Sequence, residues 1–305
     1  MKILLQVAKE SLAWSQALSK WLPEAQIFSG KGVASCDYAV VWHPPAQAFE
    51  GQTKLNAIFS VGAGVDGLLS MASLPQHVPL IRMEDVGMAD QMAEYALYIA
   101  LRHLRQINKY EQDQRAIRWD PQAFRPRSSL RIGVLGLGTL GGRVAQVLAE
   151  FGFKVSGWSR SPKNLPGIQC FHEASGLDRL LAMVDILFVM LPLTLETTNL
   201  LDEVRLSLLP AGSTLVNLSR GKIVSESALI SALDSGVLAQ AFLDVFAVEP
   251  LSPDHTFWKR TDIHITPHVA ALTPPDAAAE QVASKIRAMI AGQPVTGTVR
   301  RKFGY

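Results

Sequence analysis

The sequence predicts an α/β protein of two domains, each organised on a parallel sheet, and three observations support this. The chain has 305 residues, which is more than a single hydrophobic core usually serves. Short apolar segments with strand character alternate with segments of helical periodicity along most of the chain. Two glycine-rich turns, at 62–64 and 136–142, each follow an expected strand, as ligand-binding turns do in parallel α/β proteins.

The first part of the chain forms a small α/β domain of its own. Strands are expected at 1–7, 26–28, 38–42, 58–61 and 80–81, and a helix at 11–22. A single long helix is then expected over about 89–110. The polar, proline-containing stretch 111–129 follows and carries Trp119 and Phe124. Because loops of this length usually serve function or assembly, we interpret it as an excursion and not as a packed element.

A strand, a glycine turn, a helix and a second strand then follow in about 30 residues, the βαβ context of a dinucleotide-binding unit. The apolar run 130–135 predicts a buried strand. Helical spacing over 144–151 ends at Gly152, and 154–158 predicts the next strand.

Each glycine of the G-x-G-x-x-G pattern in this unit has a physical role. Gly136 permits a tight turn, Gly138 lets the backbone approach a pyrophosphate, and Gly141 lets the helix lie close to the strand. The helix start offers N–H groups and a positive dipole end to the phosphates. The alternative, a glycine-rich turn in some other parallel α/β protein, is weakened by the flanking strands and helix.

The end of the second strand departs from the NAD pattern. NAD-binding units usually place Asp or Glu there to accept a hydrogen bond from the ribose 2′-OH. Here the chain reads Ser159, Arg160, Ser161, Pro162, Lys163, without a carboxylate. A 2′-phosphate suits these cations, since Arg can meet it with two parallel hydrogen bonds. We therefore expect NADP(H) to be preferred and NAD(H) to remain possible; the alternative is that these are solvated loop charges.

The α/β alternation continues to the end of the chain and predicts a doubly wound parallel sheet. Strands are expected at 185–190, 215–218, 241–245 and 263–266, and helices at 177–183, 226–234 and 276–290. The last helix is expected to cross back to the first domain.

Three charged or titratable residues follow three of these strands. They are Arg220, Glu249 and His268. Singly, each is explained by a loop cation, a helix-start carboxylate or a packed histidine. Residues just past the ends of parallel strands share one crevice, so together they predict a catalytic site beside the nicotinamide.

Five motifs resemble those of the D-isomer-specific 2-hydroxyacid dehydrogenases, in the order found in that family. They are VGAGVD, G-x-G-x-x-G, NLSRG, DVFAVEP and TPHVA, and they span essentially the whole chain. Within the family, the chain most resembles the branch that reduces glyoxylate and hydroxypyruvate, because it carries VWHPP, WSRS and the closing Gly304-Tyr305. The resemblance implies a Rossmann-type coenzyme domain, 98–269, and a smaller, discontinuous, flavodoxin-like substrate domain, 1–97 with 270–305.

The resemblance also implies a reaction that suits these residues. A hydride passes from the reduced nicotinamide to the carbonyl carbon of a 2-oxo acid, and His268 donates a proton to the carbonyl oxygen. Glu249 holds the imidazole and favours its charged form. Arg220 anchors the carboxylate and polarises the carbonyl.

Further binding positions follow from the same resemblance. The substrate carboxylate is expected to meet backbone N–H groups of Ala63, Gly64 and Val65, beside Trp42 as a boundary of the pocket, with Arg220 and His268. Asp244 resembles the acceptor for the nicotinamide amide. The cofactor-binding set is Gly136, Gly138, Thr139, Leu140, Gly141, Ser159, Arg160, Ser161, Leu191, Pro192, Thr197, Leu218, Ser219 and Asp244. Trp119 is expected to reach across a homodimer interface, with ordinary packing as its alternative.

Composition limits the partners. Hydrophobic residues make up 48% and charged residues 18%, as in globular proteins. The formal net charge of +2 favours neither a nucleic-acid nor a membrane partner. Cys36 and Cys170 indicate neither an oxidising compartment nor a metal cluster, and the sequence shows no signal segment. We expect a cytoplasmic protein that holds no metal and takes a small 2-oxo or 2-hydroxy acid.

Two other functions remain open at this point. A dinucleotide-sensing regulator of the same fold is disfavoured because the chain carries no long polar tail. An NAD-dependent dehydrogenase of a larger D-2-hydroxy acid is disfavoured because the acid after the second strand, and a C-terminal regulatory domain, are missing.

Overall fold

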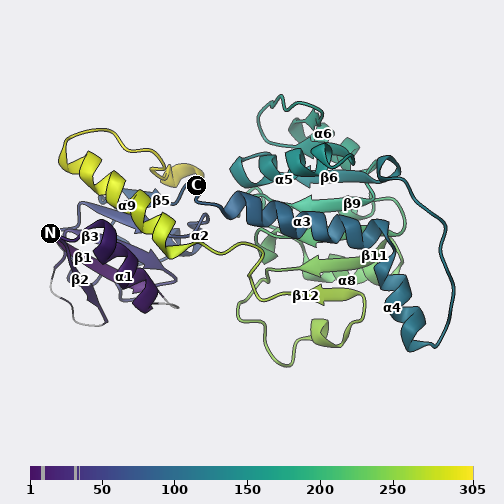
Figure 1. Cartoon of the computed structure of the whole chain (residues 1–305), viewed down its shortest axis with the longest axis horizontal. Helices are drawn as coiled ribbons and strands as arrows, with labels where there is room; N and C mark the ends of the chain where they lie inside the picture. The colour runs from purple at the N-terminus through teal and green to yellow at the C-terminus, as the bar shows by residue number, and fades with distance from the viewer. Residues whose placement is uncertain (8–10, 31–32, 34, 305) are drawn as a thin grey trace. The chain divides into compact units, whose positions relative to one another are not determined.

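A computed structural model describes residues 1–7, 11–30, 33 and 35–304 (Figure 1). Tyr305, half of the closing dipeptide noted above, lies outside them. The chain divides into two compact units, Met1–Gly87 with Thr273–Tyr305, and Met88–Leu272. The first unit is discontinuous, and the whole of helix α3 (Met88–Leu104) belongs to the second.

The first unit is built on a five-stranded parallel sheet in the order β2-β1-β3-β4-β5. This is the flavodoxin-like order 2-1-3-4-5, so the predicted fold class is confirmed here. The strands are β1 (Lys2–Val7), β2 (Gln26–Ser29), β3 (Tyr38–Trp42), β4 (Ala57–Ser60) and β5 (Leu80–Arg82).

Helices α1 (Ser11–Trp21) and α9 (Pro275–Ile290), from opposite ends of the sequence, lie side by side in this unit (Figure 1). Lys20 of α1 forms an ion pair with Asp276 of α9. The C-terminal segment pairs with the edge strand, because Val299 N–H donates to Leu80 at 2.8 Å. These contacts make the last 33 residues part of the first unit.

The second unit is built on a seven-stranded parallel sheet in the order β12-β11-β10-β9-β6-β7-β8. Counted within the unit, this is the Rossmann order 3-2-1-4-5-6 with one added strand, again as predicted. The strands are β6 (Arg131–Leu135), β7 (Lys154–Trp158), β8 (Gln169–Phe171), β9 (Ile186–Val189), β10 (Ser213–Asn217), β11 (Leu238–Leu243) and β12 (Ile263–Ile265).

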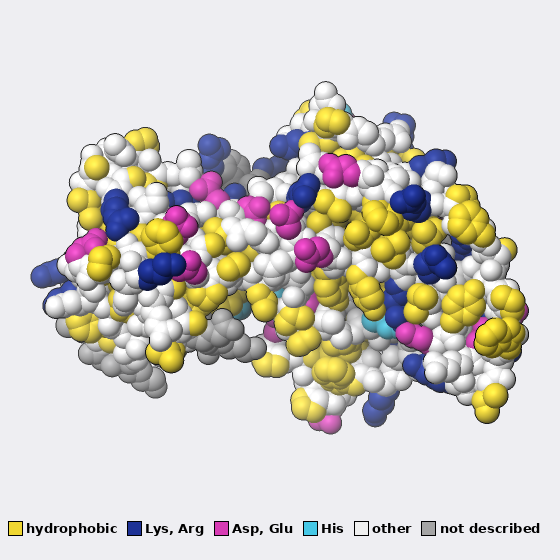
Figure 2. All heavy atoms as spheres, viewed as in Figure 1, with side chains coloured by type: hydrophobic (Ala, Val, Ile, Leu, Met, Phe, Trp, Pro, Cys, Tyr) yellow, Lys and Arg dark blue, Asp and Glu magenta, His cyan; other side chains and the backbone are white. Residues whose placement is uncertain are grey.

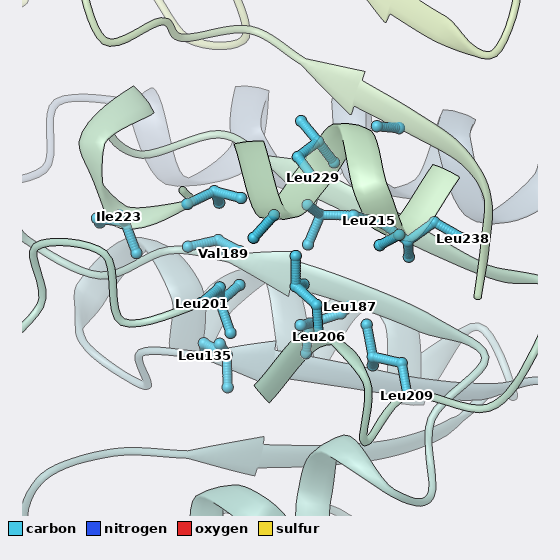
Figure 3. Packing of buried hydrophobic residues seen from close by; sticks show 14 of the residues in the cluster. Leu135, Leu187, Val189, Leu201, Leu206, Leu209, Leu215, Ile223, Leu229 and Leu238 are labelled. Atoms are coloured by element: carbon cyan, nitrogen blue, oxygen red, sulfur yellow. The ribbon is translucent and has the colours of Figure 1, made fainter. Parts of the chain in front are cut away.

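Both faces of this sheet are buried. Along β9, Ile186 and Phe188 pack with α3 and α5 (Thr139–Glu150), whereas Leu187 and Val189 point to the other face. That other face is covered by α6 (Glu173–Leu181), α7 (Glu203–Leu206) and α8 (Glu226–Asp234), and Figure 3 shows its leucine-rich core. Burial on both faces explains why the strands read as continuous apolar runs.

The single helix expected over 89–110 is wrong, because the structure has two. α3 ends at Leu104, Gln106 adopts a left-handed conformation with φ 55°, and α4 (Ile107–Arg115) then begins. Asp113 of α4 is buried and bonded to Lys109 and Arg118, so the expected excursion begins with a packed helical turn. The remainder, up to β6, runs along the edge of the second unit (Figure 1).

Several short elements are additions to the sequence-based assignment. They are β8, α2 (Asp66–Leu69), α7 and the 3-10 turns η1 (Arg127–Ser129), η2 (Gly221–Ile223), η3 (Thr256–Lys259) and η4 (Arg301–Phe303). Each has only three or four residues, too few for periodicity to be read. Within the described part of the chain, none of the helices is long and apolar enough to cross a membrane.

Candidate active site

The glycine turn between β6 and α5 has the geometry that its sequence demands. Gly136 has φ 102°, and a Cβ there would lie 2.6 Å from the Met190 carbonyl oxygen. A Cβ on Gly141 would lie 1.9 Å from the Gly136 carbonyl oxygen, so the helix start requires glycine to approach the strand end. Around Gly138, by contrast, the described residues leave a Cβ no neighbour within 4 Å. The turn is therefore tight on its inner side and open at the start of α5, which suits a pyrophosphate.

The turn after β7 combines one buried side chain with exposed ones. The Ser159 hydroxyl donates to the Ser161 carbonyl oxygen at 2.8 Å and is buried, so it shapes the turn. Arg160, Ser161 and Lys163 are exposed. In the loop after β9, hydrogen bonds from Thr194 and from a backbone N–H lower the pKa of the Glu196 carboxyl. The positive charge of Arg160 lowers this pKa further.

The loop after β9 lies next to the glycine turn. Leu191 is buried and would contact a side chain at Gly136 at 3.2 Å. Thr197 stabilises the loop, because its hydroxyl donates to Pro192 at 2.7 Å and accepts from the Thr194 N–H at 2.7 Å. Of the other expected cofactor positions, Thr139 and Leu140 open α5, and Leu218 and Ser219 are buried after β10.

Arg220 lies in a loop shaped by the last residue of β10. The side chain of Asn217 accepts from the Ser219 N–H and hydroxyl at 3.2 and 3.0 Å and donates to the Arg220 carbonyl at 2.9 Å. The Arg220 guanidinium donates to the Ser219 carbonyl at 2.7 Å. A Cβ on Gly221 would lie 2.0 Å from the Phe246 carbonyl carbon, so this loop lies directly against the loop that carries Glu249.

Glu249 and His268 come together as a hydrogen-bonded pair. His268 Nδ1 lies 2.8 Å from Glu249 Oε2, and Glu249 Oε1 accepts from the Phe246 N–H at 2.9 Å. Both side chains are about 30% exposed, at 30% and 31%. Because Nδ1 faces the carboxylate, Nε2 is the nitrogen left to face a substrate.

The pair keeps the carboxylate charged. Burial alone would raise the pKa of Glu249, but the hydrogen bonds from His268 and the Phe246 N–H lower it. The positive charges of His268 and Arg220 act in the same direction, so the pKa lies below its ordinary value. Glu249 is thus an ionised acceptor that orients the imidazole.

Asp244 holds the loop on which His268 lies. Its side chain is buried, Oδ1 accepts from the Val269 N–H at 2.9 Å, and Oδ2 accepts from the Ala270 N–H at 3.0 Å. The Asp244 carbonyl accepts from the His268 N–H at 2.8 Å. His268 itself has φ 56°, a strained value for a residue with a side chain, and such strain persists only where the surroundings hold it.

In the first unit, the glycine turn after β4 packs against Trp42. A Cβ on Gly62 would lie 1.7 Å from the indole ring of Trp42, so only glycine fits beneath it. Ala63 and Gly64 are partly exposed, and Val65 is buried at the start of α2. Trp42 therefore borders the turn whose backbone was expected to bind a carboxylate.

Sequence reasoning missed the residues that support these loops. Asn217 and Gly221 belong to the NLSRG motif, so their place beside Arg220 was a usable signal. Thr266, which donates to Asp244, opens the TPHVA motif and so carried the same signal. Tyr95, which reaches Asp244 through Thr266, carried none. Across the residues that the structure describes, His, Cys, Asp and Glu form no group of three able to hold a metal ion.

This fold and this set of residues define a protein of the D-isomer-specific 2-hydroxyacid dehydrogenases. Residues 97–270 match the family model described as "D-isomer specific 2-hydroxyacid dehydrogenase, NAD binding domain". The chain belongs to this family.

Within this family, the chain is similar along almost its whole length to several individual proteins. The chain is 42% identical over 299 residues, 96% of each chain, to glyoxylate/hydroxypyruvate reductase A of Serratia proteamaculans. It is 40% identical, with a TM-score of 0.95 over 100% of this chain and 99% of the other, to a Xanthobacter autotrophicus family member crystallised with NADPH and MES. It is 32% identical, with a TM-score of 0.94 over the same shares, to an NADPH-dependent glyoxylate/hydroxypyruvate reductase of Sinorhizobium meliloti crystallised with NADP and sulfate.

Proposed function

We propose that this protein is an NADPH-dependent reductase of small 2-oxo acids, which converts glyoxylate to glycolate and hydroxypyruvate to D-glycerate. The observation that carries the proposal is the hydrogen-bonded pair of His268 and Glu249, in a unit that also presents Arg220 and a dinucleotide turn. The names of the relatives from Serratia and Sinorhizobium support the choice of substrates.

The second unit fits NADPH. The open start of α5 at Gly138 suits the pyrophosphate, and Arg160 with the Ser161 hydroxyl suits the 2′-phosphate. Asp244 Oδ2 accepts one hydrogen bond, from Ala270, within the described residues, so it has capacity for a carboxamide N–H. When bound, NADPH supplies the hydride that reduces the carbonyl carbon.

The protein's own residues supply the proton and hold the charge. His268, as imidazolium, donates the Nε2 proton to the carbonyl oxygen, and Glu249 accepts the hydrogen bond from Nδ1 throughout. After transfer the imidazole is neutral and keeps its Nδ1 proton. Arg220 stabilises the oxygen on which negative charge develops, since a cation aimed at such an oxygen acts mainly in the transition state.

Substrate binding uses charge and backbone donors together. Arg220 forms two parallel hydrogen bonds with the carboxylate, as its planar guanidinium allows. In the first unit, the backbone N–H groups of Ala63, Gly64 and Val65 form a turn suited to a carboxylate, and we expect Trp42 beside it to limit the size of a 2-substituent. The packing of Trp42 on Gly62 supports this role, because it fixes the indole beside the turn.

A panel of 2-oxo acids tests the proposal. Purified protein is assayed for NADPH oxidation with glyoxylate, hydroxypyruvate and a larger 2-oxo acid, and the kcat/KM values are compared. We expect glyoxylate and hydroxypyruvate to exceed the larger acid. A preference for the larger acid with NADH would support the NAD-dependent alternative, and no turnover with any acid would leave a dinucleotide-binding regulator.

We also propose that the protein is a cytoplasmic homodimer. Both cysteines are free thiols, which suits a reducing compartment. Ile117, Trp119 and Phe124 follow α4 and are 96%, 97% and 88% exposed, and Figure 2 shows hydrophobic side chains gathered over α3 and α4. Large exposed apolar side chains on one face are typical of an interface, and in a symmetric dimer the same face meets its copy.

Light scattering tests the assembly. Wild-type protein at micromolar concentration should have twice the mass of the chain. On dilution, Trp119→Ala should dissociate at a higher protein concentration than Lys163→Ala, a surface control in the turn after β7. A monomeric wild type would reject both the dimer and the role of Trp119.

A further inference from the structure

Tyr95 and Thr266 form a chain of hydrogen bonds that ends on Asp244. The Tyr95 hydroxyl on α3 lies 2.7 Å from Thr266 Oγ1, and Thr266 Oγ1 lies 2.6 Å from Asp244 Oδ1. Tyr95 is 171 residues from Thr266 in sequence, so this contact joins a separate helix to the loop after β12. Neither residue belongs to the set that binds substrate or coenzyme in the function proposed above.

The direction of these hydrogen bonds follows from the chemistry of the groups. An ionised carboxylate accepts and cannot donate, so the single proton of the Thr266 hydroxyl is committed to Asp244. Tyr95 must therefore donate to Thr266. Burial raises the pKa of Tyr95, the Thr266 hydrogen bond lowers it and the charge of Asp244 raises it; the net effect is an increase, so the donor keeps its proton at neutral pH.

Asp244 in turn holds the loop that carries His268, through hydrogen bonds to the backbone N–H groups of residues 268–270. Together its carboxylate and carbonyl oxygens accept hydrogen bonds from Thr266, His268, Val269 and Ala270. His268 keeps a left-handed φ of 56° within that loop. A catalytic side chain needs its supporting hydrogen bonds to stay within a fraction of an ångström of its productive place.

We propose that Tyr95 and Thr266 are positioning residues for His268. Tyr95 orients Thr266, Thr266 orients the Asp244 carboxylate, and Asp244 fixes the strained loop from which the imidazole reaches Glu249 and the substrate. The proposal rests on the proposed reductase function only for its kinetic consequence, since the positioning itself is a property of the free protein.

Substitutions at Thr266 give the first test. Thr266→Val keeps the shape and removes the donor to a charged acceptor, so kcat should fall about tenfold or more while the KM for the oxo acid changes little. Thr266→Ser keeps the hydroxyl and should recover most of kcat. Equal kcat in the Val and Ser variants, or a loss confined to KM, would overturn the proposal.

Tyr95→Phe tests whether the tyrosine acts through the threonine. Alone it should lower kcat about two- to tenfold, as the loss of one hydrogen bond predicts. In the Thr266→Val background it should have no further effect, because the acceptor is already gone. Tyr98→Phe, the same deletion three residues along α3, is the control and should leave kcat unchanged. Additive effects of Tyr95→Phe and Thr266→Val would contradict the chain of hydrogen bonds.

Hydrogen exchange separates this proposal from the proposed function. Backbone amides of residues 268–270 should exchange faster in Tyr95→Phe and Thr266→Val than in wild type and Tyr98→Phe, with α8 as an internal reference. This result needs no turnover, so it stands even if wild type reduces none of the tested acids. Unchanged exchange at 268–270 in both variants would overturn the positioning role.

Discussion

Glu249 and His268 are held by hydrogen bonds within the protein, whereas the charged residues of the turn after β7, Arg160 and Lys163, are exposed. The first region has a carboxylate with a lowered pKa, a strained loop and a buried supporting aspartate. The second has one buried serine that shapes the turn. Proton transfer requires fixed geometry, while recognition of a phosphate tolerates adjustment of long cationic side chains. We infer that chemistry and coenzyme preference are separable in this protein.

Removal of the acid should have the largest effect. His268→Ala should lower kcat for oxo-acid reduction by about 10²-fold or more, since general acid catalysis contributes 10²- to 10⁴-fold. NADPH binding, measured by fluorescence titration, should survive because the glycine turn is unchanged. Turnover near the wild-type rate would show that His268 is not the acid, and that the hydrogen-bonded pair of Glu249 and His268 does not carry the chemistry.

Replacement of the anchor should come next. Arg220→Lys retains the charge but loses the two parallel hydrogen bonds, so kcat/KM should fall by about 10- to 100-fold through both KM and kcat. Steady-state kinetics with glyoxylate measure this. Kinetics like those of wild type would show that the carboxylate does not depend on the hydrogen bonds of Arg220, and would contradict its role as the anchor.

The exposed turn should give a smaller and more selective change. Arg160→Ala should weaken NADPH about tenfold or more relative to NADH, since a charge-assisted hydrogen bond is worth about 1.5–3 kcal/mol. Turnover at saturating coenzyme should stay near wild type. Arg160→Asp should go further, because it repels the phosphate and offers the free 2′-OH an acceptor. Lys163→Ala, a nearby cation lost from the same turn, should show whether preference is specific to Arg160 or follows total charge.

The smallest effect is expected for Glu249→Gln, in the way the free energy of unfolding depends on pH. A carboxyl with a lowered folded-state pKa stabilises the fold above its unfolded-state pKa, about 4.3 for Glu, and this contribution is lost as the pH falls through the folded value. The difference in unfolding free energy between wild type and Glu249→Gln should therefore be constant near neutral pH and shrink below about pH 4. Denaturant titrations across this range measure it. A difference independent of pH would show that the pair does not hold the carboxylate charged.

Much of the fold could be predicted because its signals are local. The expected helix at 226–234 matches α8, and Gly152, with φ 98°, ends α5 as its position indicated. The break between α3 and α4 could not be predicted, since Gln106, which takes a left-handed conformation there, is an ordinary helix former. Short elements such as α7 hold too few residues to show a period.

In the candidate site, too, some features could be predicted from the sequence and others could not. Arg220, Glu249 and His268 could be found because topology alone brings strand ends to one edge of a sheet. The hydrogen bonds of Asp244 could not, because the path of the 266–270 loop decides which N–H groups meet its oxygens. The hydrogen bond from the Ser159 hydroxyl to the Ser161 carbonyl also depends on the path of its turn, and the role of Ser159, Arg160 and Ser161 at the 2′-phosphate stays a prediction.

The ratio of kcat/KM for NADPH to that for NADH, measured with glyoxylate in wild type, His268→Ala and Arg160→Ala, tests the separation most directly. We expect a wild-type ratio well above one, the same ratio at greatly reduced turnover in His268→Ala, and a ratio about tenfold lower at near-normal turnover in Arg160→Ala. A wild-type ratio near one, or a ratio unchanged in Arg160→Ala, would contradict this separation.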